Sequence, residues 1–218
     1  MSDTSPLKIH PSAVVDEGAV IGDGTAIWHF SHICAGAVIG NSCSLGQNVL
    51  VADNASLGNN VKVQNNVAIY GGITVEDDVF LGPSCVLTNV TNPRSQVSRK
   101  SLYEKTLIRR GATIGANATI VCGITLGRYC FVGAGAVVTK DIPDYGLVSG
   151  NPAKLTGYMS RHGHKLTFNE SDKATCPESK FVFEKVDDQV HCLDLGEDEP
   201  LPSELSFGSE SYDSFKNR

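Results

Sequence analysis

The chain has 218 residues, 19% of them charged, and a formal net charge of −6 at pH 7. This length suits one repeat domain with an appendage. Nucleic-acid-binding proteins are usually basic and carry aromatic stacking platforms, so the acidic balance argues against that class. No apolar run approaches the roughly 20 residues that a membrane-spanning helix needs, and no signal peptide is evident. We expect a cytoplasmic protein without membrane insertion.

An aliphatic residue recurs at every sixth position over most of the chain, in one run from Ile9 to Leu87 and a second from Ile108 to Val138. Four positions after each aliphatic residue comes a small or branched one, and three positions after it most often Gly, Asn or Asp. These last residues tolerate the positive φ of a tight corner. A six-residue unit with two inward side chains and one corner is a short strand followed by a turn, and no helical period fits it.

A fixed period of this kind predicts a solenoid, in which each unit buries its inner face only against its neighbours. The hexads resemble those of the hexapeptide-repeat transferases. The resemblance implies an all-β fold, a left-handed parallel β-helix of triangular section over residues 1–165. Three hexads make one coil, so twenty hexads imply between six and seven coils.

A segment between the two runs breaks the period. Leu87 and Ile108 are twenty-one residues apart, which is three hexads plus three residues, so residues 88–107 are predicted to form one extended loop. Loops on a rigid scaffold concentrate function. The stretch from residue 94 to residue 110 holds one acid, Glu104, and six bases: Arg94, Arg99, Lys100, Lys105, Arg109 and Arg110. A solvated surface loop is one interpretation. An anion-binding segment is the other, because Arg binds phosphate or carboxylate bidentately and Lys binds as a point charge.

Three polar residues lie one coil apart on one face of the predicted prism. His29, Gln47 and Asn65 each follow an aliphatic residue by two positions, and the only tryptophan, Trp28, is adjacent to His29. One polar residue there would be ordinary surface, whereas three aligned ones form a candidate binding ladder for a polar ligand.

The seven cysteines are an odd number. Cys43, Cys85 and Cys130 fall in the inward column and are predicted to pack the core in a reducing compartment. Cys176 and Cys192 alone are a poor case for a metal site, so we expect no metal.

Residues 166–218 lack the hexads and form an acidic C-terminal tail. Thirteen acids and five bases give this tail a net charge of −8. Residues 181–183 predict a strand or hairpin against the β-helix, and roughly the last twenty residues are expected to be disordered or loosely held. We expect the tail to be partly ordered at most.

Several segments resemble one group of hexapeptide enzymes more closely. They are HPSAVVDEGAVIGDGTAIWHFSHI, SLGQNV, VKVQNNVAIY, GPSCVLTNVTNPRS and GATIGANATIVCGITLG. They are similar to the bacterial N-acetyltransferases that act on UDP-2-acetamido-3-amino-2,3-dideoxyglucuronate in lipopolysaccharide O-antigen biosynthesis. The resemblance implies acetyl transfer from acetyl-CoA, as co-substrate, to the 3-amino group of a UDP-linked 3-amino sugar uronic acid. It also implies a homotrimer with active sites between subunits.

The resemblance assigns candidate roles to individual residues. Asn89 would orient the substrate or hold the thioester oxygen, as the catalytic residue of the loop. Arg94 and Lys100 would face the sugar carboxylate or the diphosphate. The path of the sugar nucleotide would be lined by His29, Gln47 and Asn65.

The ending RYCFVGAGAVVTKDIPDYGLVSGNPAKL is common among hexapeptide acyltransferases and implies the cofactor-binding half. Small residues would let the pantetheine arm lie against the backbone, namely Ala116, Ala134 and Gly135. Lys140 and Lys154 would meet the phosphates of CoA. Gly135 has a structural alternative to cofactor binding, because the corner requires a residue that tolerates a positive φ.

No histidine lies between His32 and His162, whereas many hexapeptide acetyltransferases carry a catalytic histidine in or beside the loop. The loop presents Asn89 instead, and an amide side chain cannot accept a proton at neutral pH. A neutral sugar amine is already a competent nucleophile, so we predict direct attack, with the proton leaving to water or to the CoA thiolate. His29 as general base is the alternative.

Other functions remain open or are disfavoured. Acetylation of another nucleotide-linked amino sugar is the nearest alternative. Acetylation of serine is disfavoured, because the sequence shows no long amino-terminal helical domain of the kind expected of serine acetyltransferases. A non-catalytic solenoid would have a plain surface, so the basic loop and the polar ladder argue against it. A β-helical carbonic anhydrase needs three histidine ligands for a metal. The hexad runs hold only His10, His29 and His32, all before the loop, and no histidine lies near the second run, so this function is rejected.

Overall fold

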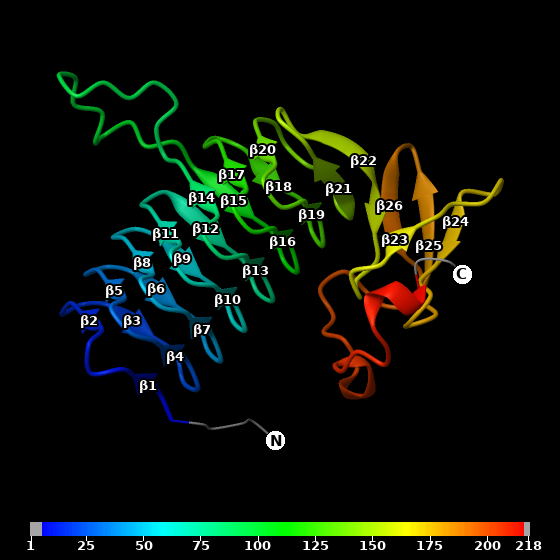
Figure 1. Cartoon of the computed structure of the whole chain (residues 1–218), viewed down its shortest axis with the longest axis horizontal. Helices are drawn as coiled ribbons and strands as arrows, with labels where there is room; N and C mark the ends of the chain where they lie inside the picture. Colours follow the sequence, from blue (N-terminus) through cyan, green and yellow to red (C-terminus); the bar gives the residue numbers. More distant parts are fainter. Residues whose placement is uncertain (1–5, 216–218) are drawn as a thin grey trace.

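The computed structural model describes residues 6–215 (Figure 1). The chain from Lys8 to Ser149 winds into a left-handed β-helix whose three faces are parallel sheets, here named sheets A, B and C. The predicted fold is therefore confirmed. Among the described residues, no helix is long and apolar enough to cross a bilayer.

Successive coils contribute one short strand to each sheet in turn. Sheet A contains β1 (Lys8–Ile9), β4 (Ala26–Ile27), β7 (Ser44–Leu45), β10 (Lys62–Val63), β13 (Phe80–Leu81), β16 (Thr113–Ile114), β19 (Phe131–Val132) and β21 (Gly146–Ser149). Sheet B contains β2 (Val14–Val15), β5 (His32–Ile33), β8 (Leu50–Val51), β11 (Ala68–Ile69), β14 (Val86–Leu87), β17 (Thr119–Ile120) and β20 (Val137–Val138). Sheet C contains β3 (Val20–Ile21), β6 (Val38–Ile39), β9 (Ser56–Leu57), β12 (Ile73–Val75), β15 (Thr106–Ile108) and β18 (Thr125–Leu126).

The corners between the sheets form three edges of the prism. The A–B edge follows the strands of sheet A and comprises residues 10–13, 28–31, 46–49, 64–67, 82–85, 115–118 and 133–136. The B–C edge follows sheet B and comprises residues 16–19, 34–37, 52–55, 70–72, 88–105, 121–124 and 139–141. The C–A edge follows sheet C and comprises residues 22–25, 40–43, 58–61, 76–79, 109–112 and 127–130.

Neighbouring coils keep a constant register, with Lys62 opposite Ser44, eighteen positions away. The register changes at the last coil, where Phe131 pairs with Leu147, sixteen positions away. It changes much more at an earlier coil, where Phe80 pairs with Thr113, thirty-three positions away. That coil is therefore fifteen residues longer than an ordinary one. The extra residues leave the prism between β14 and β15 as the long projecting loop of Figure 1. The loop ends at residue 105, slightly before the predicted 107, because β15 begins at Thr106.

The hexad side chains fill the prism. Ile33, Leu45, Ile69, Leu81 and Ile114 are each 0% exposed. Burying an aliphatic side chain of this size contributes roughly 1.5–3 kcal/mol. The stability of the β-helix therefore comes from a regular stack of small contributions.

The corners also follow the sequence pattern. Asn48, Asn54, Asn60, Asn66 and Asp78 all have φ between 54° and 63°. Asn and Asp adopt this left-handed conformation more readily than other residues with a Cβ. Their side chains also join coils, since Asn48 Nδ2 donates to Asn66 Oδ1 at 3.1 Å.

The predicted core cysteines lie in the core. Cys43, Cys85 and Cys130 have exposed fractions of 2%, 2% and 0%. Burial raises the pKa of Cys85 to about 12, so this thiol is protonated at neutral pH and acts as an apolar side chain.

The parallel coils end at Ser149, earlier than the predicted boundary at residue 165. Strand β22 (Lys154–Met159) turns back and pairs antiparallel with β21, placing Lys154 opposite Ser149. Strand β23 (Lys165–Leu166) then pairs antiparallel with β22. The twenty strands β1 to β20 correspond to the twenty predicted hexads, and β21 adds one parallel strand beyond them.

The rest of the described chain forms an appendage beside the last coils (Figure 1). It contains a three-stranded antiparallel sheet and two short 3₁₀ helices: β24 (Lys173–Thr175), β25 (Val182–Val186), β26 (Gln189–Cys192), η1 (Ser203–Leu205) and η2 (Tyr212–Phe215). The predicted hairpin around residues 181–183 is present, with Phe183 0% exposed. Its ring packs edge-on against Tyr145 at 5.4 Å. The Tyr129 hydroxyl on the C–A edge donates to the carbonyl of Glu197 at 2.8 Å, so the appendage covers that edge.

Candidate functional site

Several predicted site residues lie in one column along the A–B edge. Backbone hydrogen bonds join successive coils there: the N–H of Asn48 donates to the carbonyl of His29 at 2.9 Å, and that of Gly135 to the carbonyl of Ala116 at 2.8 Å. The strand register places the column members one above another in the order His29, Gln47, Asn65, Pro83, Ala116 and Ala134. The structure therefore brings the predicted sugar ladder and the predicted cofactor surface onto a single edge.

His29 lies in a stack of aromatic rings at the start of this column. Its ring centroid is 3.5 Å from that of His10 and 6.3 Å from that of Trp28. The rings of His29 and Trp28 are nearly parallel. The Nδ1 atom of His29 is buried and has no hydrogen-bond partner among residues 6–215. Buried polar atoms are rarely left unpaired. His29 is therefore the strongest ligand-contact candidate of the column.

Asn65 has a structural role that its spacing alone does not reveal. Its Oδ1 accepts the backbone N–H of Gln47 at 2.8 Å, and a Cβ on Gly46 would approach that oxygen to 2.5 Å. The same type of bond recurs on the C–A edge, where Asn59 Oδ1 accepts the N–H of Asn41. Asn65 thus joins two coils and has less to offer a ligand than predicted, while Gln47 is exposed.

The other half of the column is lined by small residues. Ala116 is half-buried, and Ala134 and Gly135 are exposed. Gly135 has φ of 70°, and a Cβ built there would meet no atom within 4 Å. A Cβ on Gly115, by contrast, would lie 2.5 Å from the backbone nitrogen of Ala134. The coils are tightly packed inside and open outside, which suits a narrow chain lying against the backbone.

Asn89 lies on a different edge, the B–C edge, at the base of the loop. Its carbonyl accepts the N–H of Glu104 at 2.9 Å, which closes the loop. The Glu104 carboxylate accepts the hydroxyl of Thr91 and, at 3.1 Å, its backbone N–H. These bonds, the hydroxyl first, hold the pKa of Glu104 below its ordinary value. Among the described residues no partner holds the Asn89 amide, which leaves it available to a substrate.

Glu104 is the residue of the loop that sequence reasoning left without a role. Its being the only acid among the loop bases was the available signal. A Cβ on Gly123 would approach Glu104 Oε2 to 2.7 Å, so the carboxylate is held between Thr91 and the next coil. Glu104 therefore fixes the base of the loop beside Asn89.

The loop gathers positive charge around a shallow hollow of about 340 Å³. The residues that line it are Val90, Pro93, Arg94, Ser95, Val97, Arg99, Lys100 and Tyr103. Arg99 is fixed by a hydrogen bond from its Nε to the carbonyl of Asn92 at 2.9 Å. The structure thus brings the predicted residues Arg94 and Lys100 together and adds Arg99.

Two of the six bases counted with the loop belong elsewhere. Arg109 and Arg110 follow β15 and lie on the C–A edge. Arg110 forms ion pairs with Asp77 at 2.7 Å and with Asp78 at 3.3 Å, and Arg109 lies 3.9 Å from Asp144. The interpretation of all six as one anion-binding cluster is therefore wrong for these two, whose charges are already matched.

The two lysines assigned to the CoA phosphates lie apart. Lys140 is exposed on the B–C edge, after β20. Lys154 is exposed at the start of β22, opposite Ser149. The register of β19 and β21 puts Gly150, next to Ser149, one coil after Ala134. Lys154 therefore continues the small-residue half of the A–B edge, whereas Lys140 is on the same edge as the loop.

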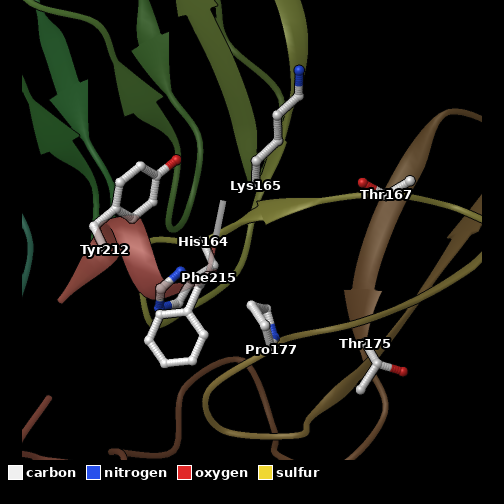
Figure 2. Close-up of a pocket in the computed structure, with 7 residues that line it drawn as sticks. All are labelled: His164, Lys165, Thr167, Thr175, Pro177, Tyr212 and Phe215. Atoms are coloured by element: carbon white, nitrogen blue, oxygen red, sulfur yellow. The ribbon is translucent and has the colours of Figure 1, made fainter. Parts of the chain in front are cut away.

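A further hollow, of about 310 Å³, lies within the appendage (Figure 2). His164 and Phe215 pack there with ring centroids 4.6 Å apart. The Nε2 atom of His164 lies 2.7 Å from Glu178 Oε2, and both side chains are almost fully buried. None of the residues predicted to bind substrate or cofactor lines this hollow.

Comparison with known proteins supports the same division of the chain. Residues 18–53, 54–89 and 105–140 match the family described as "Bacterial transferase hexapeptide (six repeats)". The unmatched gap between 89 and 105 coincides with the loop.

The chain is 45% identical over 175 residues to dTDP-3-amino-3,6-dideoxy-alpha-D-galactopyranose 3-N-acetyltransferase of Aneurinibacillus thermoaerophilus, covering 80% of this chain and 90% of that protein. It is 26% identical to serine acetyltransferase 4 of Arabidopsis thaliana over 77% of this chain, but spans only 34% of that longer protein.

Among solved structures, the acetyltransferase domain of PglB from Neisseria gonorrhoeae in complex with acetyl coenzyme A aligns with a TM-score of 0.46 and 27% identity, covering 70% of this chain and 58% of that one. The family assignment rests on the hexapeptide repeats and on the relative that this chain matches over nearly its whole length. This chain belongs to the hexapeptide-repeat sugar N-acetyltransferases, and it is an acetyl-CoA-dependent enzyme.

Proposed function

We propose that the protein transfers the acetyl group of acetyl-CoA to the 3-amino group of a UDP-linked 3-amino sugar uronic acid. The observation that carries this proposal is the A–B edge, where polar His29 and Gln47 continue into the small residues Ala116 and Ala134. A sugar nucleotide and a pantetheine arm would then meet end to end along one edge. The relative from Aneurinibacillus acts on a nucleotide-linked 3-amino sugar, which supports that reacting group.

The basic loop supports an acidic sugar. The galactose derivative in that relative's name is deoxygenated at C6 and carries no carboxylate. In this chain Arg94, Arg99 and Lys100 line one hollow, which suits a carboxylate in addition to the diphosphate. Lys154, on the strand that pairs with the last coil after Ala134, would meet a phosphate of CoA, and Lys140 would do so from the neighbouring edge.

The reaction we propose is direct aminolysis. The neutral amine attacks the thioester carbonyl, a C–N bond forms and the C–S bond breaks. The proton of the new ammonium passes to the departing CoA thiolate or to water. The Asn89 amide N–H would donate to the carbonyl oxygen while negative charge develops there, which is the kind of interaction that stabilises such a transition state most.

His29 has two possible roles, and its unpaired Nδ1 atom is compatible with both. It would contact the sugar, or it would accept the amine proton. The variant His29→Ala separates these roles. If it raises KM for the sugar and leaves kcat nearly unchanged, His29 binds substrate. A large loss of kcat together with loss of the acidic limb of the pH profile would instead identify the general base.

The placement of the site supports a homotrimer. The loop with Asn89 lies on the B–C edge, whereas the column lies on the A–B edge, so the two flank sheet B within one chain. A ring of three chains joins different surfaces of neighbouring copies, which would bring the loop of one chain to the column of the next. The outer faces of sheets B and C carry exposed Val14, Val20, Val38 and Val86, which is typical of a surface that is covered in the assembly.

A thiol-release assay with acetyl-CoA tests the proposed function. The acceptors would be the UDP-linked 3-amino uronic acid, the dTDP-linked 3-amino-6-deoxy sugar and L-serine. Fast release with the uronic acid alone supports the proposal. Release with the neutral sugar alone would support the proposed reaction but identify a neutral sugar, not the uronic acid, as the substrate. Release with serine would favour the function of the Arabidopsis relative. No release with any acceptor, and no binding of CoA by calorimetry, would leave a non-catalytic solenoid.

A further inference from the structure

A cluster of three metal-binding side chains lies on the B–C edge of the first two coils, away from the acetyl-transfer residues. Asp16, His32 and Cys34 each offer one possible ligand atom, and these atoms all lie within 4.8 Å of one another. The Nε2 atom of His32 is 3.1 Å from Asp16 Oδ2 and 4.0 Å from Cys34 Sγ.

The coil geometry produces this cluster from residues with no obvious motif. Asp16 and Cys34 occupy equivalent positions one coil apart, and both follow a strand of sheet B. Val14 pairs with His32, so His32 points out of the same sheet just before the corner that carries Cys34. Sequence spacing therefore hides the three residues, while the repeat of eighteen brings them together.

The arrangement is that of a chelate rather than of a catalytic relay. In a relay, the nucleophile and the carboxylate contact opposite nitrogens of the imidazole. Here the carboxylate and the sulfur both approach the same nitrogen, Nε2. A tetrahedral Zn²⁺ ion with bonds of about 2.0–2.3 Å holds its ligand atoms roughly 3.2–3.8 Å apart, close to the two separations observed.

The surroundings of the sulfur favour a cation. Two carboxylates, those of Asp16 and Asp53, act electrostatically on Cys34. The two carboxylates make the local potential negative.

We propose that Asp16, His32 and Cys34 bind one Zn²⁺ ion per chain, with a fourth position open to water. A set of one sulfur, one imidazole nitrogen and one carboxylate oxygen suits Zn²⁺ better than the hard cations Mg²⁺ and Ca²⁺. The site is independent of the proposed acetyl transfer, because none of its residues lies in the loop or in the column.

The ion would hold the first coil of the solenoid against the second. Asp16 belongs to the first coil, and His32 and Cys34 belong to the second. The hexad residues of the first coil are the least covered, with Ile9 42% exposed, and terminal units of a solenoid need a device that caps them. A metal cross-link between these coils would supply one.

Titration of the untagged, metal-free protein with Co²⁺ tests the proposal. We expect a cobalt–thiolate charge-transfer band that saturates at one ion per chain, and displacement of that ion by Zn²⁺. Cys34→Ser should abolish the band, and Asp16→Asn should weaken Zn²⁺ binding by about tenfold or more. Cys192→Ser, which removes another half-buried cysteine, should change neither.

A thermal measurement provides a second readout. Zn²⁺ should raise the melting temperature of the wild type and of Cys192→Ser, but not that of Cys34→Ser, with circular dichroism confirming that each variant is folded. A wild type without a thiolate band, a Cys34→Ser variant that binds as tightly as the wild type, or saturation at one ion per three chains would each overturn the proposal.

Discussion

The two halves of the A–B edge have the same backbone and different side chains. Before the loop, the column carries His29, Gln47 and Asn65; after it, the equivalent corners carry Ala116 and Ala134. The hydrogen-bond ladder runs through both halves with N–O distances of 2.8–3.0 Å. Because the hexad core and the ladder determine the fold, the outward corner residues are free to differ. A single edge of the β-helix can therefore present polar side chains to one ligand and exposed backbone to another.

The largest expected effect is at Asn89, at the base of the loop on the other edge. Asn89→Ala should lower kcat by about 10²–10³-fold, the cost of removing one donor to a developing oxyanion, and should leave the KM for acetyl-CoA nearly unchanged. Steady-state kinetics measure both. Asn92→Ala, elsewhere in the same loop, is the matched control and should be near wild type. A kcat within twofold of the wild type in Asn89→Ala would remove the catalytic role.

Filling the small-residue half should block the cofactor. Ala134→Trp places a large ring where the corner is exposed and open, and overpacking of this kind costs about 1–3 kcal/mol, or roughly tenfold to a hundredfold in CoA affinity. Calorimetry with CoA measures the loss. Ala35→Trp, on an exposed corner of another edge, should bind CoA normally. Equal CoA binding by both variants would show that the cofactor lies elsewhere.

The loop bases should distinguish acidic from neutral sugars. Arg94→Ala should raise the KM for the uronic acid substrate by about five- to tenfold, because charge-assisted bonds are worth up to about 3 kcal/mol and exposure weakens them. The effect should shrink as salt is added. Lys105→Ala, which does not line the basic hollow, is the control. An equal rise in KM with a neutral nucleotide sugar would assign Arg94 to the diphosphate instead.

The smallest effect concerns the appendage, which contains neither half of the column. Hydrogen bonds from the Ser209 backbone N–H and then from His164 hold the pKa of Glu178 below its ordinary value. A carboxyl with a lowered pKa contributes stability at neutral pH, and this contribution is lost as the pH falls through the ordinary Glu range to the folded-state value.

Protease resistance of the segment around η2 should therefore decrease on acidification in the wild type. The Glu178→Gln substitution should destabilise the appendage by about 1 kcal/mol at neutral pH. Its protease resistance should then depend less on pH, and acetyl transfer should be unchanged. Glu184→Gln removes a half-exposed partner of Lys173 and should behave as the wild type does. A wild-type pH profile identical to that of Glu178→Gln would contradict this account of the appendage.

The periodic part of the molecule was predictable because its period is physical. Two inward residues and one corner per six positions can only be buried by stacking, so Ile33 and Leu45 in the core and Asn48 at a corner are where the pattern predicts. The loop was predictable for the same reason, as a change of phase between Leu87 and Ile108.

Other features escaped prediction because they depend on contacts between coils. Asn65 accepts the backbone N–H of Gln47, and Arg110 forms an ion pair with Asp77 rather than belonging to the loop. Both residues look like free surface residues in the sequence. The separation of Asn89 and Ala134 onto two edges also depends on where each corner falls around the prism. The appendage has no repeat, and its packing on Tyr145 could not be read from spacing.

The claim that the loop of one chain completes the column of another can be tested by mixing two inactive variants. Co-expression of Asn89→Ala and Ala134→Trp chains in equal amounts yields mixed trimers. In these, a site is intact when its loop comes from the second variant and its column from the first. Random assembly around a threefold axis predicts recovery of about one quarter of the wild-type activity. No recovery above the separate variants, with mixed trimers demonstrated by mass, would show that each chain builds its own site and would contradict the shared-site account.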